Sequence, residues 1–190
     1  MEVDGKLKIL VPIAEDSEEI ETACITDTLV RAGAQVVVAS VSGDLKVKMS
    51  RGLKILADCL IDECKDQEWD AIACPGGMPG AVNLRDNEVL TGLLKAQAEK
   101  KKVTAAVCAS PAVIFAAHGL LPESGATCYP APKFMEMVPE RSDAQVAVHG
   151  HIITSQGPGT SLQFALKIVE CLYGAEKAAE LAKAMLTTTA

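Results

Sequence analysis

The sequence predicts one α/β domain over residues 1–190, a three-layer α/β/α sandwich around a doubly wound, mostly parallel sheet. Short apolar runs alternate with amphipathic segments along the whole chain, the pattern typical of this architecture. Hydrophobic residues make up 49% of the chain, with only three Phe, two Tyr and one Trp, so the core must consist mainly of Ala, Val, Ile and Leu. A chain of 190 residues is long enough for one sizeable core, and no linker or repeat divides it.

The first half of the chain predicts a βαβ unit followed by a small hairpin. Residues 6–14 form an apolar run that indicates a buried strand, and residues 18–32 have apolar positions at helical spacing that end at Gly33. A second strand over 34–41 completes the unit, which favours parallel pairing through a right-handed crossover. Residues 46–49 and 53–57 flank Ser50-Arg51-Gly52 and predict a hairpin beside the main sheet.

The second half continues the alternation of strands and helices. A strand over 69–74 ends at Pro75-Gly76-Gly77, a helix covers 87–101, and a strand covers 103–107. We expect a short helix over 111–118, a short strand at 126–128, and a hairpin that turns at 149–150 into a strand over 152–155. A long helix opens at 157–159 and runs to 173, and a last helix spans 175–185.

Charge and composition exclude several classes of function. A net charge of −7 and a pI near 5.0 argue against nucleic-acid binding, which needs clustered Lys and Arg. The N-terminal segment has no apolar core of a signal peptide, and no apolar run approaches the roughly 18 residues of a membrane span, so we expect a cytoplasmic protein without a membrane partner. The odd number of cysteines then predicts free thiols. His149-Gly150-His151 predicts a hairpin turn, and we expect no metal site and no cofactor.

Cys108 is the candidate nucleophile. Ligands of doubly wound sheets bind outside the carboxyl ends of the parallel strands, where the segments 15–21, 75–80, 108–111 and 156–159 should converge. Cys108 ends a strand, small Ala109 and Ser110 admit a sharp turn, and Pro111 suits the first turn of a helix. The positive end of that helix is expected to lower the thiol pKa. The alternative for any cysteine is a small core hydrophobe, which is our interpretation of the other six.

Glu21 and the glycines at 76 and 77 are the candidate partners of Cys108. The backbone N–H groups of Gly76 and Gly77 could bind a substrate oxygen, although an ordinary tight turn is the alternative. The helical pattern turns Glu21 inward, where burial would keep its carboxyl protonated and couple it to Cys108, whereas Glu18 and Glu19 are expected to be solvated. His118 lies two to three helical turns from Cys108, too far to act as its base.

Five segments in the same order resemble the DJ-one (Parkinsonism-associated deglycase) branch of the ThiJ/PfpI superfamily: residues 18–22, 50–51, 75–81, 105–111 and 154–161. The resemblance implies a flavodoxin-like, class I glutamine-amidotransferase-like sheet, an oxidisable nucleophile at Cys108 and a protonated Glu21. It also implies an oxyanion pocket from the N–H groups of Gly77 and Ala109. Further family positions match Arg51, which would reach across a homodimer interface, and the pocket-lining Gly157 and Pro158.

The same resemblance implies a glutathione-independent glyoxalase or deglycase that needs no cofactor. Its substrates would be methylglyoxal, glyoxal or early glycation adducts, and its products hydroxyacids such as lactate. The alternative is a cysteine-based oxidative-stress sensor and redox-regulated chaperone. Tyr129 stands where many members have a histidine, which makes it a candidate pocket residue without a histidine's proton chemistry. Ala109 directly follows Cys108 where the protease-like branch has a histidine, and no downstream His-x-Glu is present, which disfavours protease and amidotransferase activity.

Overall fold

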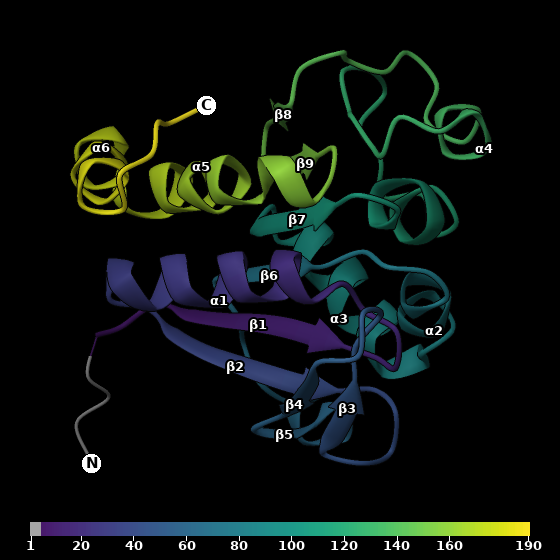
Figure 1. Ribbon diagram of the computed structural model, residues 1–190. Coiled ribbons are helices and arrows are strands. Elements are labelled where there is room, and N and C mark those ends of the chain that lie inside the picture. Colours follow the sequence, from purple (N-terminus) through teal and green to yellow (C-terminus); the bar gives the residue numbers. More distant parts are fainter. Residues whose placement is uncertain (1–4) are drawn as a thin grey trace.

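The computed structural model describes residues 5–190, and a seven-stranded sheet forms its centre (Figure 1). The strand order is β5-β2-β1-β6-β7-β9-β8, and every neighbouring pair is parallel except β8 with β9. The strands of this sheet are β1 (Lys8–Ile13), β2 (Gln35–Ser40), β5 (Cys59–Leu60), β6 (Ala71–Cys74), β7 (Val103–Val107), β8 (Val146–His149) and β9 (Ile152–Ser155). The predicted fold class is confirmed.

Helices cover both faces of the sheet, and a separate hairpin lies at its side (Figure 1). The hairpin pairs β3 (Lys46–Lys48) with β4 (Lys54–Leu56), as predicted. The helices are α1 (Glu19–Ala32), α2 (Gly80–Arg85), α3 (Glu88–Glu99), α4 (Pro132–Met135), α5 (Ser161–Tyr173) and α6 (Ala175–Ala184). Two 3-10 turns (Ile61–Cys64 and Pro158–Thr160) and a π-helical turn (Pro111–Phe115) complete the elements.

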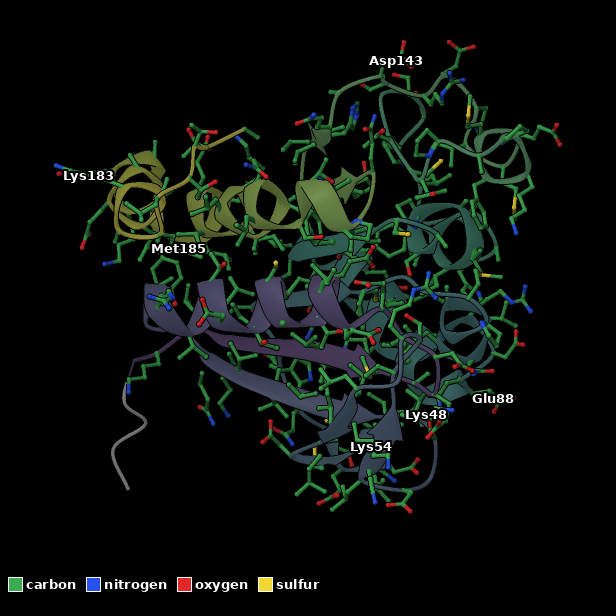
Figure 2. All side chains as sticks on the ribbon, in the orientation of Figure 1. Lys48, Lys54, Glu88, Asp143, Lys183 and Met185 are labelled. Carbon is green, nitrogen blue, oxygen red and sulfur yellow. The ribbon has the colours of Figure 1, made fainter. Side chains whose placement is uncertain are left out.

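Two apolar clusters on opposite faces of the sheet form most of the core. Along β1, Ile9 and Val11 point to the cluster under α1, α5 and α6, while Leu10 points to the cluster under α3. Phe164 and Trp69 are the largest side chains of the two clusters, respectively. Most charged side chains lie at the surface, and Figure 2 shows Glu88, Asp143 and Lys183 at the periphery. No helix within residues 5–190 is long and apolar enough to cross a membrane.

Local signals explain where the helices begin and end. The Glu18 side chain accepts a hydrogen bond from the Glu21 N–H at 2.8 Å and caps α1, and Gly33 ends that helix with a φ of 100°. Asn87 caps α3 in the same way, accepting from the Leu90 N–H at 2.9 Å. These caps agree with the helix starts and stops that the sequence predicts.

The structure differs from the prediction at five short segments. Strand β5 and helices α2 and α4 were not predicted, because segments of two to six residues are too short for a hydrophobic period to show. Residues 126–128 are irregular, although the backbone N–H of Thr127 is bound at 2.9 Å by the Thr154 hydroxyl. The predicted helix over 111–118 is a five-residue π-helical turn followed by irregular turns. Residues 1–4 of the segment considered for a signal peptide lie outside the described residues.

Candidate active site

Four loops meet at the carboxyl ends of β1, β6, β7 and β9, as the sequence predicts. Main-chain hydrogen bonds join them: the Glu18 N–H donates to the Gly76 carbonyl at 3.0 Å, and the Cys108 N–H donates to the Ser155 carbonyl at 2.9 Å. A buried side-chain bond adds to these, because the Ser110 hydroxyl donates to the Pro75 carbonyl at 2.6 Å. The loops therefore form one connected rim rather than independent flexible segments.

Cys108 occupies the sharp turn that directly follows β7. Its φ of +64° lies in the left-handed region that non-glycine residues rarely adopt. The turn is held on both sides, since the Cys108 N–H is bound to Ser155 and the Cys108 carbonyl accepts the Tyr129 N–H at 2.7 Å. A strained backbone that is fixed by its neighbours is a frequent feature of reactive sites, and it projects this side chain above the sheet.

Residue 76 must be glycine because a side chain would not fit there, and not because its backbone conformation requires glycine. A Cβ atom at residue 76 would lie 2.7 Å from the Cβ of Cys108 and 3.0 Å from Oε2 of Glu21. The Gly76 N–H also donates to Oε2 of Glu21 at 2.6 Å. Glu21 and Cys108 therefore lie on the same side of a backbone that approaches both of them closely.

Gly77 combines a left-handed conformation with a close approach to the loop after β1. Its φ is +92°, and an added Cβ would lie 2.3 Å from the Asp16 carbonyl oxygen. This position directs the Gly77 N–H toward Cys108, where it and the Ala109 N–H favour the thiolate. The two N–H groups expected to form an oxyanion pocket are thus together at the sulfur.

Glu21 is a fully buried carboxyl group beside Cys108. Burial raises its pKa to about 7, although the hydrogen bond from Gly76 opposes this rise. Oε2 accepts the Gly76 N–H, whereas Oε1 is buried and makes no hydrogen bond within the described part of the chain. Oε1 is therefore the oxygen that is free to carry a proton, in agreement with the predicted inward orientation.

Cys108 and Glu21 lie so close together that ionisation of one disfavours ionisation of the other. Burial raises the pKa of the Cys108 thiol to about 12, and charge repulsion from the Glu21 carboxylate adds to the rise. That repulsion exists only while Glu21 is ionised, so protonation of Glu21 favours the thiolate, as do the Gly77 and Ala109 N–H groups.

This electrostatic picture corrects the expected source of thiol activation. The sequence predicted a lowered pKa from the N-terminus of a helix beginning at Pro111. The structure has only a five-residue turn there, too short for a substantial helix dipole, and burial moves the pKa upward. Individual N–H groups and the proton on Glu21 are what can stabilise a thiolate here.

A cavity of about 430 Å³ opens over Cys108 and contains most of the predicted pocket residues. Arg51 and Pro158 line it together with Tyr129, whose ring packs edge-on against Phe134 with centroids 6.3 Å apart. Gly157 lies next to the same ring, since a Cβ there would be 3.3 Å from Tyr129. The lining also includes Gly77, Ala109, Glu18, Ile20, Ser50, Met78 and Phe134.

Glu18 and Glu19 are buried, contrary to the expectation that both are solvated. Glu18 caps α1 and lines the cavity. Glu19 accepts hydrogen bonds from the Ser50 hydroxyl at 2.9 Å and the Arg51 N–H at 2.8 Å, so it fixes the hairpin turn at the rim. Burial would raise the pKa of Glu19, but these and other hydrogen bonds lower it overall. Spacing along one helix could not reveal partners supplied by a distant turn.

The histidines lie away from Cys108. His118 Nε2 lies 2.9 Å from the Arg85 carbonyl oxygen and 3.3 Å from the Thr91 hydroxyl. Gly150 has a φ of +60° in the β8–β9 turn, which confirms the hairpin predicted at His149-Gly150-His151. Across residues 5–190 no group of three or more His, Cys, Asp or Glu side chains could hold a metal ion.

Comparisons with known proteins agree with the fold. The model of the DJ-1/PfpI family matches residues 7–171. Protein DJ-1 homolog B of Arabidopsis thaliana is 48% identical over 96% of this chain and 42% of its own length. The glutathione-independent glyoxalase DJR-1.2 of Caenorhabditis elegans is 41% identical over 92% of each chain.

A solved structure described as Toxoplasma gondii DJ-1, oxidized, has a TM-score of 0.92 and 48% identity, and the match covers 96% of this chain and 99% of that one. The chain spans less than half the length of the two Arabidopsis relatives, at 42% and 46%.

Proposed function

The chain belongs to the DJ-1/PfpI family, and from that premise we propose that it is a cofactor-independent glyoxalase that converts small α-oxoaldehydes to hydroxyacids. One observation carries the proposal: the Cys108 thiol lines a cavity of about 430 Å³ and lies beside the fully buried Glu21 carboxyl group, whose pKa burial raises to about 7. A relative named a glutathione-independent glyoxalase, at 41% identity, supports it.

The first step is addition of the Cys108 thiolate to the aldehyde carbon of methylglyoxal. The S–C bond forms as the carbonyl π bond breaks, and the N–H groups of Gly77 and Ala109, which lie beside the sulfur, would bind the resulting oxyanion. Glu21 carries the proton in this state, so it can protonate the oxygen and give a neutral hemithioacetal. A Glu21 carboxylate can accept the proton that the thiol loses, which gives this state.

The second step transfers a proton from the former aldehyde carbon to the neighbouring carbon through the Glu21 carboxylate. The first carbon is oxidised to a thioester and the second is reduced to a carbinol, so no external oxidant or cofactor is needed. Water then breaks the S–C bond, which releases lactate and regenerates the thiol. Tyr129 and Arg51 line the cavity and would contact the substrate rather than move this proton.

Lactate production from methylglyoxal tests this proposal. Cys108→Ala should abolish turnover, whereas Cys171→Ala, which removes an exposed cysteine on α5, should leave it unchanged. Equal rates for wild type and Cys108→Ala would exclude the mechanism. Early glycation adducts of cysteine, lysine or arginine present the same electrophile in masked form, and their removal by the same variants tests the deglycase reaction.

Glu21→Gln separates the nucleophile from the proton carrier. The amide removes the charge repulsion on Cys108 but cannot accept a proton from carbon. We expect alkylation of Cys108 by iodoacetamide to continue, with a lower apparent pKa, while lactate production is lost. Loss of alkylation without loss of turnover would contradict the assigned roles.

A second candidate function is an oxidative-stress sensor based on the same cysteine. A relative described as oxidized supports it, and the Gly77 and Ala109 N–H groups could bind the oxygens of an oxidised sulfur. Intact and peptide mass spectrometry after mild peroxide treatment tests it, because Cys108 should oxidise before the other cysteines. A chaperone activity would be indicated by suppression of client aggregation that persists in Cys108→Ala.

We also propose a homodimer in the cytoplasm, with no nucleic-acid partner. Ile20 and Leu53 are each 53% exposed, and Met78 is 43% exposed, next to the exposed Arg51. Ile20, Met78 and Arg51 belong to the cavity rim, so a second copy that covered these apolar side chains would also enclose the site. Sedimentation of the wild type and of Leu53→Glu tests this assembly.

A further inference from the structure

Cys59 and Cys64 form a pair of thiols that the proposed function does not use. Their sulfur atoms lie 3.6 Å apart. Cys59 is the first residue of β5 and is half-buried, and Cys64 ends the following 3-10 turn and is completely buried. Three strands separate β5 from β7, so at about 4.8 Å per strand the pair is roughly 19 Å from Cys108 in the plane of the sheet.

We propose that Cys59 and Cys64 are a dithiol site that hydroperoxides oxidise to an intramolecular disulfide. A disulfide requires the sulfurs to approach from 3.6 Å to about 2.05 Å. The surrounding backbone can absorb this movement, because β5 is the edge strand of the sheet and pairs with β2 at only two positions, Ala39↔Cys59 and Ser40↔Leu60. The inference is independent of the chemistry at Cys108.

The environment assigns different roles to the two sulfurs. Cys59 is the one that solvent can reach, so its thiolate attacks one peroxide oxygen and the O–O bond breaks. A Cys59 sulfenic acid forms, and the departing hydroxide takes up the proton that the Cys59 thiol had released and becomes water. Cys64 then attacks the Cys59 sulfur, the S–S bond forms, the S–O bond breaks, and the hydroxide leaves with the Cys64 proton as water. Two thiols and one hydrogen peroxide thus give one disulfide and two waters.

The contact between the thiols supports this order of events. Burial raises the pKa of both thiols, that of Cys64 to about 12. The hydrogen bond between them adds to the rise at Cys64 and opposes it at Cys59. Cys64 therefore keeps its proton more readily than Cys59 does, which suits Cys64 as the resolving cysteine and Cys59 as the attacking cysteine. Asp58 and Glu63 oppose ionisation of Cys59, so the attack is slower than that of an activated catalytic thiol.

A single peptide reports the outcome. Lys54 and Lys65 bound a tryptic peptide that contains both cysteines and no others. After graded hydrogen peroxide and alkylation with N-ethylmaleimide, the wild-type peptide should lose two hydrogen atoms, take no alkyl group, and regain two after dithiothreitol. Exposed Cys171 has no sulfur partner within the described residues and serves as the internal reference for unassisted oxidation.

Two substitutions of Cys64 separate the steps. Cys64→Ala removes the resolving thiol, so dimedone labelling of Cys59 sulfenic acid should rise several-fold over the wild type. Cys64→Ser can still donate a hydrogen bond, and should form the sulfenic acid faster than Cys64→Ala. The same experiments in Cys108→Ser should give the same disulfide, which separates this site from the proposed nucleophile.

The proposal is overturned if the wild-type peptide still takes two alkyl groups once Cys171 has been oxidised. It is also overturned if Cys59 accumulates as sulfenic or sulfinic acid while Cys64 stays alkylatable, or if either cysteine forms a disulfide with a different residue. The wild-type measurement decides these outcomes even if a Cys64 variant does not fold.

Discussion

Substitution of Gly76 by alanine should disable the site through a single methyl group. The new Cβ would lie 2.7 Å from the Cβ of Cys108 and 3.0 Å from both Oε2 of Glu21 and the Val107 carbonyl oxygen. An ordinary contact begins near 3.4 Å, so the backbone of residue 76 and Cys108 must separate by about 0.7 Å.

The expected magnitude follows from this displacement. Forcing a methyl group into a packed interior destabilises a protein by about 1–3 kcal/mol, and we expect Gly76→Ala within this range. Moving a reacting group by about 1 Å can reduce the rate by about 100-fold, so a shift of this size should lower kcat by one to two orders of magnitude. The carboxyl of Glu21 would also lose the 2.6 Å hydrogen bond from the Gly76 N–H, or have it lengthened.

The assay compares Gly76→Ala with Gly92→Ala. Gly92 lies inside α3 with no atom within 4 Å of an added Cβ, so alanine there should stabilise the fold by about 1 kcal/mol and leave turnover unchanged. Urea unfolding gives the stabilities, and lactate production and the rate of Cys108 alkylation report the site. Wild-type turnover and alkylation in Gly76→Ala would show that Glu21 and Cys108 are not packed against residue 76 as described.

Three further predictions concern the carboxyl group, the rim and a helix cap. The pKa of Glu21 is about 7 in the folded state, against 4.5 in the unfolded chain. The free energy of unfolding of the wild type should therefore fall by about 3 kcal/mol relative to Glu21→Gln as the pH rises from 4.5 to above 7. Identical pH profiles of urea unfolding for the two proteins would refute this. Ser110→Ala leaves the buried Pro75 carbonyl without its 2.6 Å bond and should destabilise by about 1–3 kcal/mol, measured against Ser110→Thr. Asn87→Ala removes the cap on the Leu90 N–H and should destabilise by about 1 kcal/mol with normal turnover, and a turnover defect would contradict the separation of α3 from the site.

Much of the fold could be predicted because local pattern and tertiary packing agree. Ile9 and Val11 face one apolar cluster and Leu10 faces the other, so β1 reads as a continuous apolar run, which is typical of a central parallel strand. Gly33 ends α1 in the left-handed conformation for which glycine is favoured. Strand β5 is only two residues long and is formed by its pairing with β2. A segment this short has no hydrophobic period from which a strand could be predicted.

The position of the candidate site could be predicted from the sequence, whereas the burial of Glu19 and the pKa shift of Cys108 could not. Four strand ends and the turn at Cys108 follow from chain order alone, because parallel strands place their carboxyl ends at one edge. The burial of Glu19 depends on Ser50 and Arg51, which are more than 30 residues away in the chain, with separations of 31 and 32. No pattern within one helix contains that information.

Three features follow from the sequence alone: the alternation of strands and helices, the position of a cysteine at the end of a strand, and a glutamate on the inward side of α1. The tertiary structure alone decided how charge is distributed among them. The pKa of Cys108 depends on burial and on the Glu21 carboxylate, and both arise from segments that meet only in the folded chain. The same holds for Cys59 and Cys64, whose 3.6 Å separation is set by an edge strand and a turn rather than by their spacing in sequence. Composition and period are properties of neighbouring residues, whereas desolvation and charge repulsion are properties of atoms brought together in space.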